Sequence, residues 1–161
     1  MSAGYRVGQG FDIHRLVPDR KLILGGIEIP HETGLSGHSD ADVLLHALMN
    51  ALLGAVGKGD IGTHFPDTDP RFKGVSSVTL IGQVLQLTRE AGFAVVNADI
   101  TVIAQRPRLA PHYGAIRTRL AKLMEVPAEV VNLKAGTMEG LGSIGEGKAI
   151  AAMAVVLLHA G

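Results

Sequence analysis

The chain has 161 residues with 15 basic and 15 acidic side chains, so its formal net charge is zero. This balance gives no reason to expect a nucleic acid or an acidic membrane surface as partner, and the absence of tryptophan leaves few large rings for stacking bases. The absence of cysteine excludes disulfides and thiolate metal sites and fits a reducing cytoplasm. The length predicts one domain, residues 1–161.

Strands, a helix and a long loop are predicted in the first half of the chain. The elements expected are a strand at 5–13, a hairpin at 22–29, a helix at 40–55 and a loop at 59–70. Apolar residues recur at a helical period in 40–55, and the side chain of Ser39 or Asp40 is expected to cap this helix. The loop is rich in proline, glycine and aspartate, which predicts either a functional segment or a solvated turn.

The second half alternates helices and strands. We expect helices at 76–91 and 112–125 and strands at 93–105 and 130–134. The segment 149–158 is ambiguous, because its alanines favour a helix and its valines favour a strand. It is also the longest apolar run and is too short to span a bilayer, and the first residues do not have the pattern of a signal peptide. An α+β or α/β class without a membrane segment is therefore expected.

Two segments carry a possible metal site. Asp12 and His14 are two residues apart, so in a continuing strand both point from one face. Asp42, His46 and Asn50 follow at steps of four and share one face of the expected helix. A carboxylate and two imidazoles are a ligand set that leaves the fourth position of a tetrahedral zinc open, as in catalytic sites. The alternative is that the histidines are ordinary partly buried side chains and that the polar stripe is solvated surface.

Two glycine motifs resemble nucleotide-binding motifs, but each lacks a residue that the motif requires. Gly8-x-Gly10 follows a strand, but the third glycine of a dinucleotide fingerprint is missing. The segment 142–148 fits the P-loop spacing, but Ala149 replaces the hydroxyl residue that holds magnesium and Glu146 would repel phosphates. Neither motif is expected to bind a nucleotide.

Four blocks of residues occur together in one order and spacing. They are Gly8-x-Gly10-x-Asp12-x-His14, Gly37-His38-Ser39-Asp40-x-Asp42-x-x-x-His46-Ala47, Gly59-Asp60-Ile61-Gly62-x-x-Phe65-Pro66-Asp67-Thr68-Asp69 and Lys134-Ala135-x-Thr137-x-Glu139-x-Leu141-Gly142. With these blocks the chain closely resembles the 2-C-methyl-D-erythritol 2,4-cyclodiphosphate synthase family over essentially its whole length. Any one block would be a weak signal, whereas four in register are specific.

The resemblance implies a fold, an assembly and a reaction. The fold would be ferredoxin-like α+β, with a mixed sheet packed by helices, in a homotrimer like that of bacterial chorismate mutase with active sites between subunits. It also implies that 149–158 is a strand. The implied reaction is that of a phosphorus-oxygen lyase in non-mevalonate isoprenoid synthesis, which releases CMP from a cytidine diphosphate substrate and closes a cyclic diphosphate.

The resemblance also implies the roles of individual residues. Zinc would be held by Asp12, His14 and His46, and a second divalent cation, magnesium or manganese, by Glu139. His38 and Thr137 would hold phosphate in its reacting geometry as catalytic residues. Substrate contacts would come from Ser39, Asp60, Ile61, Gly62, Phe65, Asp67, Asp69, Ala104, Arg108, Ala135 and Gly136.

Several positions depart from the family pattern. Asn50 replaces a usual aspartate, and we expect its amide to accept a weaker hydrogen bond from a ligand imidazole. Gly136 and Met138 replace usual threonines, which removes hydroxyl donors near the nucleotide phosphates. Ser143 and Glu146 replace an aromatic residue and an arginine that, in relatives, line a central cavity able to hold an isoprenoid diphosphate. A carboxylate opposes an anionic head group, so that ligand is not expected.

Two other functions remain open from the sequence. His38, Asp40 and His46 could bind a metal that activates water, which would make the protein a metal-dependent phosphohydrolase. A non-catalytic trimeric binder of nucleotides or prenyl diphosphates would bind ligand without turnover. The products separate these functions, because only a cyclising enzyme makes a ring.

Overall fold

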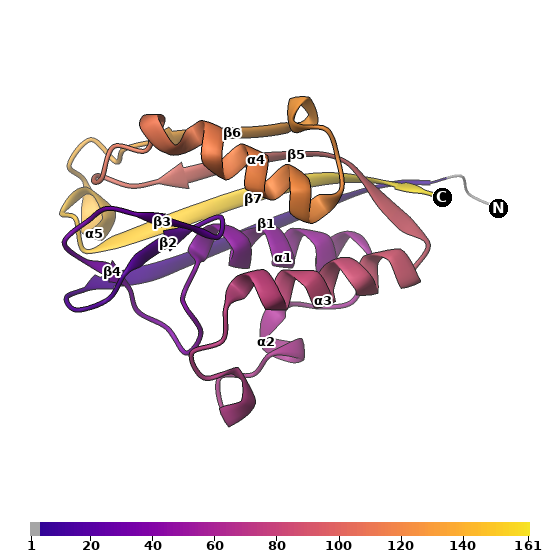
Figure 1. Ribbon diagram of the computed structural model, residues 1–161, viewed down its shortest axis with the longest axis horizontal. Coiled ribbons are helices and arrows are strands. Elements are labelled where there is room, and N and C mark those ends of the chain that lie inside the picture. The colour runs from indigo at the N-terminus through magenta and orange to yellow at the C-terminus, as the bar shows by residue number, and fades with distance from the viewer. Residues whose placement is uncertain (1–3) are drawn as a thin grey trace.

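The computed structural model describes residues 4–161, so the first three residues of the predicted 1–161 domain lie outside it (Figure 1). The strands are β1 (Tyr5–Val17), β2 (Leu22–Leu24), β3 (Ile27–Ile29), β4 (Gly34–Leu35), β5 (Phe93–Ile103), β6 (Val131–Gly136) and β7 (Ala149–Ala160). The α-helices are α1 (Val43–Ala55), α2 (Ile61–His64), α3 (Ser77–Glu90), α4 (Tyr113–Met124) and α5 (Gly142–Gly145). Short 3-10 turns occupy Pro70–Phe72, Ala110–His112 and Ala128–Val130.

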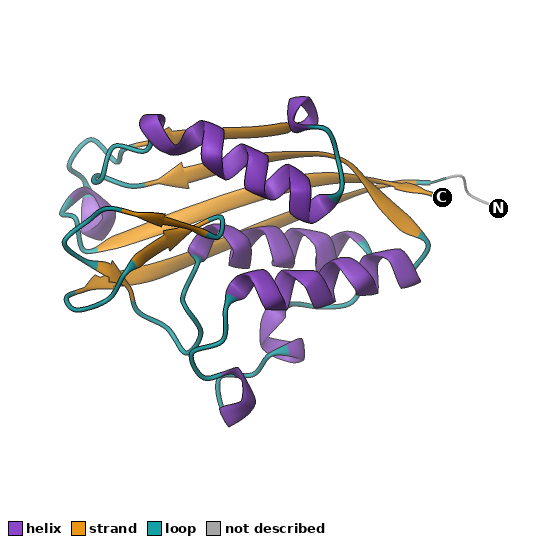
Figure 2. Cartoon of the chain, in the orientation of Figure 1, coloured by secondary structure: helices purple, strands orange, loops and turns teal. Residues whose placement is uncertain are grey.

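Five strands form one mixed sheet in the order β4-β1-β7-β5-β6. The central strand β7 runs antiparallel to both β1 and β5, whereas β5 and β6 are parallel and are joined through α4. The hairpin β2-β3 forms a separate two-stranded sheet. The long helices α1, α3 and α4 lie over the same face of the large sheet (Figure 2).

The α+β class with a mixed sheet packed by helices is confirmed. The long strands follow one another as β1, β5, β6 and β7, with long helices only after the first two. A ferredoxin-like unit instead has the order β-α-β-β-α-β, so this finer part of the prediction is not confirmed. The last strand of the chain, β7, lies at the centre of the sheet, between β1 and β5.

Two glycines of β1 bring the helix α1 against the sheet. A Cβ atom on Gly8 would lie 1.8 Å from the carbonyl oxygen of Ala51, and one on Gly10 would lie 1.9 Å from that of Ala47. Only a residue without a side chain permits such an approach of a strand to a helix backbone. The Gly-x-Gly motif is therefore a packing feature, in agreement with its rejection as a nucleotide fingerprint.

The two faces of β1 have different environments. Gly8 and Gly10 are buried under α1, whereas the alternating Val7, Phe11 and Ile13 are 68%, 51% and 44% exposed on the other face. The exposed apolar side chains continue on β7 with Met153 and Val155. The period-two alternation thus places Asp12 and His14 on the helix side of the sheet.

Three local predictions are corrected. The N-cap of α1 is Asp42, whose carboxylate accepts from the N–H of Leu45; neither Ser39 nor Asp40 is the cap. The segment 59–70 is not structureless, because it contains α2. The strand expected at 5–13 is present but continues to Val17.

The ambiguous C-terminal segment is a strand, as the resemblance implied. It becomes β7 because both of its edges pair, with β1 on one side and β5 on the other, over most of its length. In residues 4–161 no helix is both long and apolar enough to cross a membrane.

Candidate metal and substrate site

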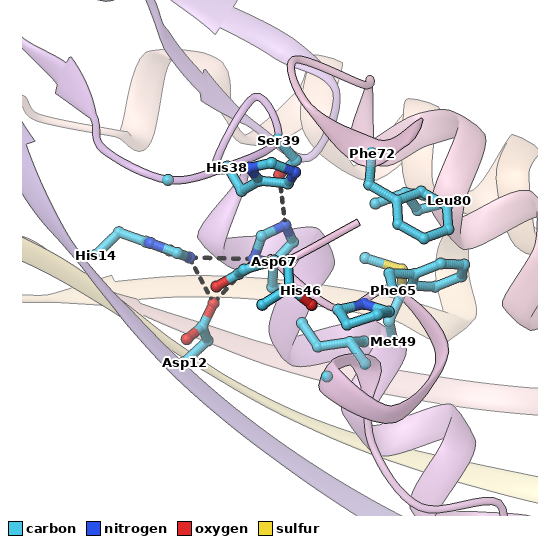
Figure 3. Close-up of a pocket in the computed structure, with 15 residues that line it drawn as sticks. Asp12, His14, His38, Ser39, His46, Met49, Phe65, Asp67, Phe72 and Leu80 are labelled. Carbon is cyan, nitrogen blue, oxygen red and sulfur yellow. Dashed lines mark hydrogen bonds and ion pairs between the residues drawn. The ribbon is translucent and has the colours of Figure 1, made fainter. Parts of the chain in front are cut away.

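Asp12, His14 and His46 converge between β1 and the first turn of α1 (Figure 3). The Oδ2 atom of Asp12 lies 2.7 Å from Nε2 of His14 and 3.0 Å from Nδ1 of His46. The two ring nitrogens are 3.1 Å apart. Among the described residues these three form the group of side chains that could hold a metal ion, and they are the set that the family resemblance implied.

The geometry fits a divalent cation. Bonds of about 2.0–2.2 Å to zinc place tetrahedral ligand atoms about 3.3–3.5 Å apart, so a few tenths of an ångström of outward movement would admit the ion. One carboxylate and two imidazoles provide three ligands, and the fourth position faces a cavity. These residues are therefore suited to a catalytic metal rather than to a closed structural one.

The three groups form an ionic cluster. Burial raises the pKa of Asp12, but hydrogen bonds and charge interactions with His14 and His46 outweigh it and hold this pKa well below its usual value. Burial lowers the pKa of His14, and the contact with Asp12 more than offsets this, so the net shift is upward. The carboxylate is thus ionised, as a ligand must be, and a bound cation would replace the protons that hold the cluster together.

Neighbouring groups orient both imidazoles. The Nδ1 atom of His14 lies 2.9 Å from the carbonyl oxygen of Ser36, so it donates there and Nε2 faces the cluster. His46 is turned the other way, with Nδ1 in the cluster and Nε2 3.1 Å from the hydroxyl oxygens of both Ser39 and Ser77. Each ring therefore presents one nitrogen to the metal position and uses the other as an anchor.

A cavity of about 450 Å³ opens beside the cluster. Its lining includes the predicted site residues Asp12, His14, His38, Ser39, His46, Ile61, Gly62, Phe65 and Asp67. Figure 3 shows Phe65 and Phe72 at one end of this cavity and the cluster of Asp12, His14 and His46 at the other. The site thus combines an ionic end with an apolar wall.

The segment after α1 is held by its own side chains. Asp60 caps α2 by accepting from the N–H and the hydroxyl of Thr63 through Oδ1. Asn50 accepts from the N–H of Ile61 at 2.9 Å. No hydrogen bond joins Asn50 to His46 within residues 4–161, so the predicted contact is wrong: the amide positions the loop because α2 begins directly beside it.

The side chain of His38 contacts the backbone of Asp69. The Nε2 atom of His38 lies 3.0 Å from the carbonyl oxygen of Asp69, while the Asp69 carboxylate pairs with Arg71 at 2.6 Å. Asp69 does not line the cavity with His38. Its predicted substrate contact stays a prediction.

The remaining predicted residues gather elsewhere. Ala104, Arg108, Ala135, Gly136 and Thr137 line a second cavity of about 350 Å³ where β5 and β6 end. This cavity shares no lining residue with the first, and β7 separates its strands from β1. Glu139 lies two residues after Thr137 and is exposed, and its N–H donates to the hydroxyl of Thr137. The predicted site is therefore divided into two groups within one chain.

Two structural roles were not predicted. Asp42 is fully buried and its carboxylate accepts from the N–H groups of Gly25 and Gly26, so it is neither solvated nor a metal ligand. Burial raises the pKa of Asp42 to about 6. Ser77 is also fully buried and contacts His46. The helical period identified the Asp42 stripe but not its burial, and no sequence pattern indicates the contact of Ser77 with a residue 31 positions away.

Fold and site together define an α+β protein with a carboxylate and two histidines arranged for a divalent metal beside a polar cavity. A family model described as the YgbB family matches residues 5–159. The chain belongs to this family, whose members similar to it carry the name 2-C-methyl-D-erythritol 2,4-cyclodiphosphate synthase. This confirms the resemblance drawn from the four sequence blocks.

Individual relatives cover nearly all of the chain. The synthase of Trichlorobacter lovleyi is 59% identical over 153 residues, which are 95% of this chain and 98% of that protein. A structure of 2C-methyl-D-erythritol-2,4-cyclodiphosphate synthase in a CDP-bound form is 41% identical with a TM-score of 0.88, covering 95% of this chain and 99% of that one. The Plasmodium falciparum IspF CDP complex is 32% identical with a TM-score of 0.87 and covers 99% of both chains.

Proposed function

We propose that the protein is a 2-C-methyl-D-erythritol 2,4-cyclodiphosphate synthase, a phosphorus-oxygen lyase of isoprenoid precursor synthesis. Its substrate would be 4-diphosphocytidyl-2-C-methyl-D-erythritol 2-phosphate. The observation that carries the proposal is the Asp12–His14–His46 cluster beside a substrate-sized cavity, in a chain 59% identical to a protein of that name. CDP-bound structures of relatives support a cytidine diphosphate ligand.

The chemistry is an intramolecular transfer. An oxygen of the 2-phosphate attacks the β-phosphorus, a new P–O bond closes the ring, and the bond to the bridging oxygen breaks so that CMP leaves with the electron pair. The nucleophile is already anionic, so no general base is required. The barrier is the repulsion between phosphates and the entropy of folding a flexible chain into a ring. A divalent cation, when bound, lowers the repulsion as a Lewis acid.

The residues that line the first cavity, together with Asp60 at the start of α2, would orient the erythritol part. We assign contacts with the hydroxyl groups to Asp60, Gly62 and Asp67, and a phosphate contact to His38. Asp60 uses Oδ1 for its own helix cap, which leaves its other oxygen to accept from a hydroxyl. Asp67 is exposed at the cavity and its charge reaches the metal cluster, since it contributes to the raised pKa of His14. Carboxylates suit hydroxyls and would repel misplaced phosphate.

The residues of the second cavity would bind the cytidine and its phosphates from a neighbouring subunit. This part of the proposal covers the homotrimer with active sites between subunits, Thr137 as a catalytic phosphate contact, and Glu139 as ligand of a second magnesium or manganese ion. The separation of the two cavities in one chain supports it. So does the bare face of the sheet, where Val7, Phe11 and Val155 expose apolar surface that a second copy would cover.

Three further parts of the proposal concern the whole protein. We propose that residues 1–161 act as a single catalytic domain, that zinc is the metal of the His-His-Asp cluster, and that the enzyme works in the cytoplasm. The zinc assignment follows from the ligand set, which has two imidazoles and one carboxylate. The lack of cysteine is consistent with the cytoplasmic assignment.

Phosphorus-31 spectra of the product test the reaction. Incubation of the purified protein with the diphosphocytidyl substrate, zinc and magnesium should give CMP and a cyclic diphosphate in equal amounts. Release of inorganic phosphate or of linear phosphates would contradict the proposal. The substrate without protein, and the protein treated with a chelator, are the controls.

No structural observation favours the phosphohydrolase. That function needed His38, Asp40 and His46 around one metal, but the Asp40 carboxylate is held by Ser77 and His38 contacts a backbone carbonyl. The non-catalytic binder gains no specific support either. Glu146, whose carboxylate pairs with Lys148 at 2.5 Å, still disfavours an isoprenoid diphosphate as ligand.

A further inference from the structure

We infer that Ser77 and Asp40 form a hydrogen-bonded support that fixes the orientation and the tautomer of the metal ligand His46. Ser77 is the first residue of α3 and Asp40 lies in the turn before α1, so the support joins segments far apart in the sequence. Neither residue contacts the metal position or lines the cavity. Both are therefore positioning residues rather than catalytic ones.

The contacts of His46 define what the support has to do. Its Nδ1 atom lies among the ligand atoms, 3.0 Å from Oδ2 of Asp12. A neutral imidazole carries a proton on one nitrogen and a lone pair on the other. To bind a metal through Nδ1, His46 must carry its proton on Nε2, and that proton needs an acceptor because His46 is only 8% exposed.

The hydroxyl oxygen of Ser77 can only accept a hydrogen bond from His46. Its proton is donated to Oδ1 of Asp40, and its backbone N–H donates to Oδ2 of the same carboxylate at 3.0 Å. With its only proton committed, the Ser77 oxygen can meet Nε2 of His46, 3.1 Å away, solely as an acceptor. The chain of donors thus runs from His46 through Ser77 to Asp40.

Ser39 does not fix the direction of its hydrogen bond with Nε2 of His46. Its hydroxyl oxygen is also 3.1 Å from Nε2 and accepts from the N–H of Ala41, but the carboxylate of Asp40 does not take its proton. Ser39 alone could therefore either donate to Nε2 or accept from it. The geometry assigns the selection of the Nε2–H form to Ser77 and its carboxylate.

The support is itself held in place. Asp40 is anchored by its N–H, which donates to the carbonyl of Val75 at 3.0 Å, and Ser77 is fully buried, which keeps solvent water from replacing its hydroxyl. Partners behind a metal ligand typically change metal affinity about 10–100-fold when they are removed. An effect of that size is expected here.

The inference rests on the metal site of the proposed function but not on cyclisation, so the test measures metal binding. Zinc affinity of the full-length protein is determined by competition with a chelator for the wild type and for S77A. S77A should bind zinc about 10–100-fold more weakly. In proton spectra of the zinc-loaded proteins, the Nε2–H signal of His46 should be sharp in the wild type and broadened by exchange with water in S77A.

S76A is the matched control. The Ser76 hydroxyl accepts from the N–H of Val78 at the same helix start but does not contact His46. S76A should keep the wild-type zinc affinity, and S77T, which keeps a hydroxyl, should recover most of it. D40N preserves the shape of the side chain, and its zinc affinity should lie between those of the wild type and S77A. Thermal unfolding of each variant without metal shows whether it is folded.

The outcomes separate this inference from the metal site as a whole. Failure of the wild type to bind zinc would remove the metal from the proposed function. If the wild type binds zinc and S77A binds equally well with an unchanged Nε2–H signal, the role of Ser77 is refuted. Equal weakening in S76A and S77A would also refute it, since the effect would then belong to the helix start and not to the hydrogen bond.

Discussion

The two cavities differ in how much of their structure one chain supplies. Around the first, β1, α1 and the turn at 36–40 hold every metal-binding side chain with at least one hydrogen bond or ion pair. Around the second, Arg108 lies in the segment after β5, and Thr137 and Glu139 lie in the segment after β6. All three residues are exposed. A single chain therefore preorganises the metal-binding cluster at the first cavity, whereas the polar side chains at the second cavity are left exposed.

The largest expected effect comes from removing a ligand at the first cavity. H46A should lose zinc binding and ring closure by more than about 100-fold, beyond the loss typical for residues behind a ligand. Metal analysis and phosphorus-31 spectra measure both. The control is H64A, because His64 is a histidine of the neighbouring loop that contacts the carbonyl of Lys58 and not the cluster. Undiminished zinc in H46A would contradict the site.

Mixing two inactive variants tests whether the cavities act across subunits. H46A damages only the first cavity and T137A only the second. If each active site combines the first cavity of one copy with the second of a neighbour, trimers reassembled from equal amounts of both variants should regain about a quarter of the wild-type sites. If both cavities of one chain served the same site, the mixture would stay inactive. Activity is assayed before and after reassembly.

Glycine substitutions compare the rigidity of the two regions. G10A would place a Cβ atom 1.9 Å from the carbonyl of Ala47, which forces β1 and α1 apart and should destabilise the protein by about 3 kcal/mol or prevent folding. G136A meets no atom within 4 Å at the second cavity and should change stability by less than about 0.5 kcal/mol. Urea unfolding gives both values. Equal effects would show that the two regions are packed alike.

The last prediction concerns the pH dependence of stability and the buried carboxylate of Asp42 at the start of α1. Its pKa in the folded protein is raised to about 6, above the unfolded value of about 3.8, so the folded state holds the proton more tightly. The stability that this provides is complete below about pH 4 and is lost as the pH rises through 6, by about 3 kcal/mol in total. The measurement is the free energy of unfolding of the metal-free wild type relative to D42N across this range. A difference independent of pH would contradict the raised pKa.

Local sequence signals were sufficient for much of the fold. The helical period located α1, α3 and α4, and the β-branched runs located β5 and β6 within a few residues. Alternation along a strand placed Asp12 and His14 on one face, and one turn of a helix placed Asp42 and His46 on one face. These features depend on residues near one another in the chain, so spacing alone determines them.

Other features depended on contacts between distant segments. The ambiguous residues 149–158 became a strand because β1 and β5 pair with both of its edges, and Asp42 became buried because the β2-β3 turn donates two backbone N–H groups to it. Asn50 was wrongly assigned to His46 because the helix period shows which face it lies on but not that α2 starts beside it.

The sequence by itself therefore determined the class of fold, the candidate ligands on each element and, through four blocks in register, the family. Only the tertiary structure decided the strand order, the support behind His46, and the separation of the predicted substrate residues into two cavities. The physical reason is that periodicity and spacing report which side chains share a face of one element, while the partner of that face is chosen by packing between elements that the local pattern does not contain.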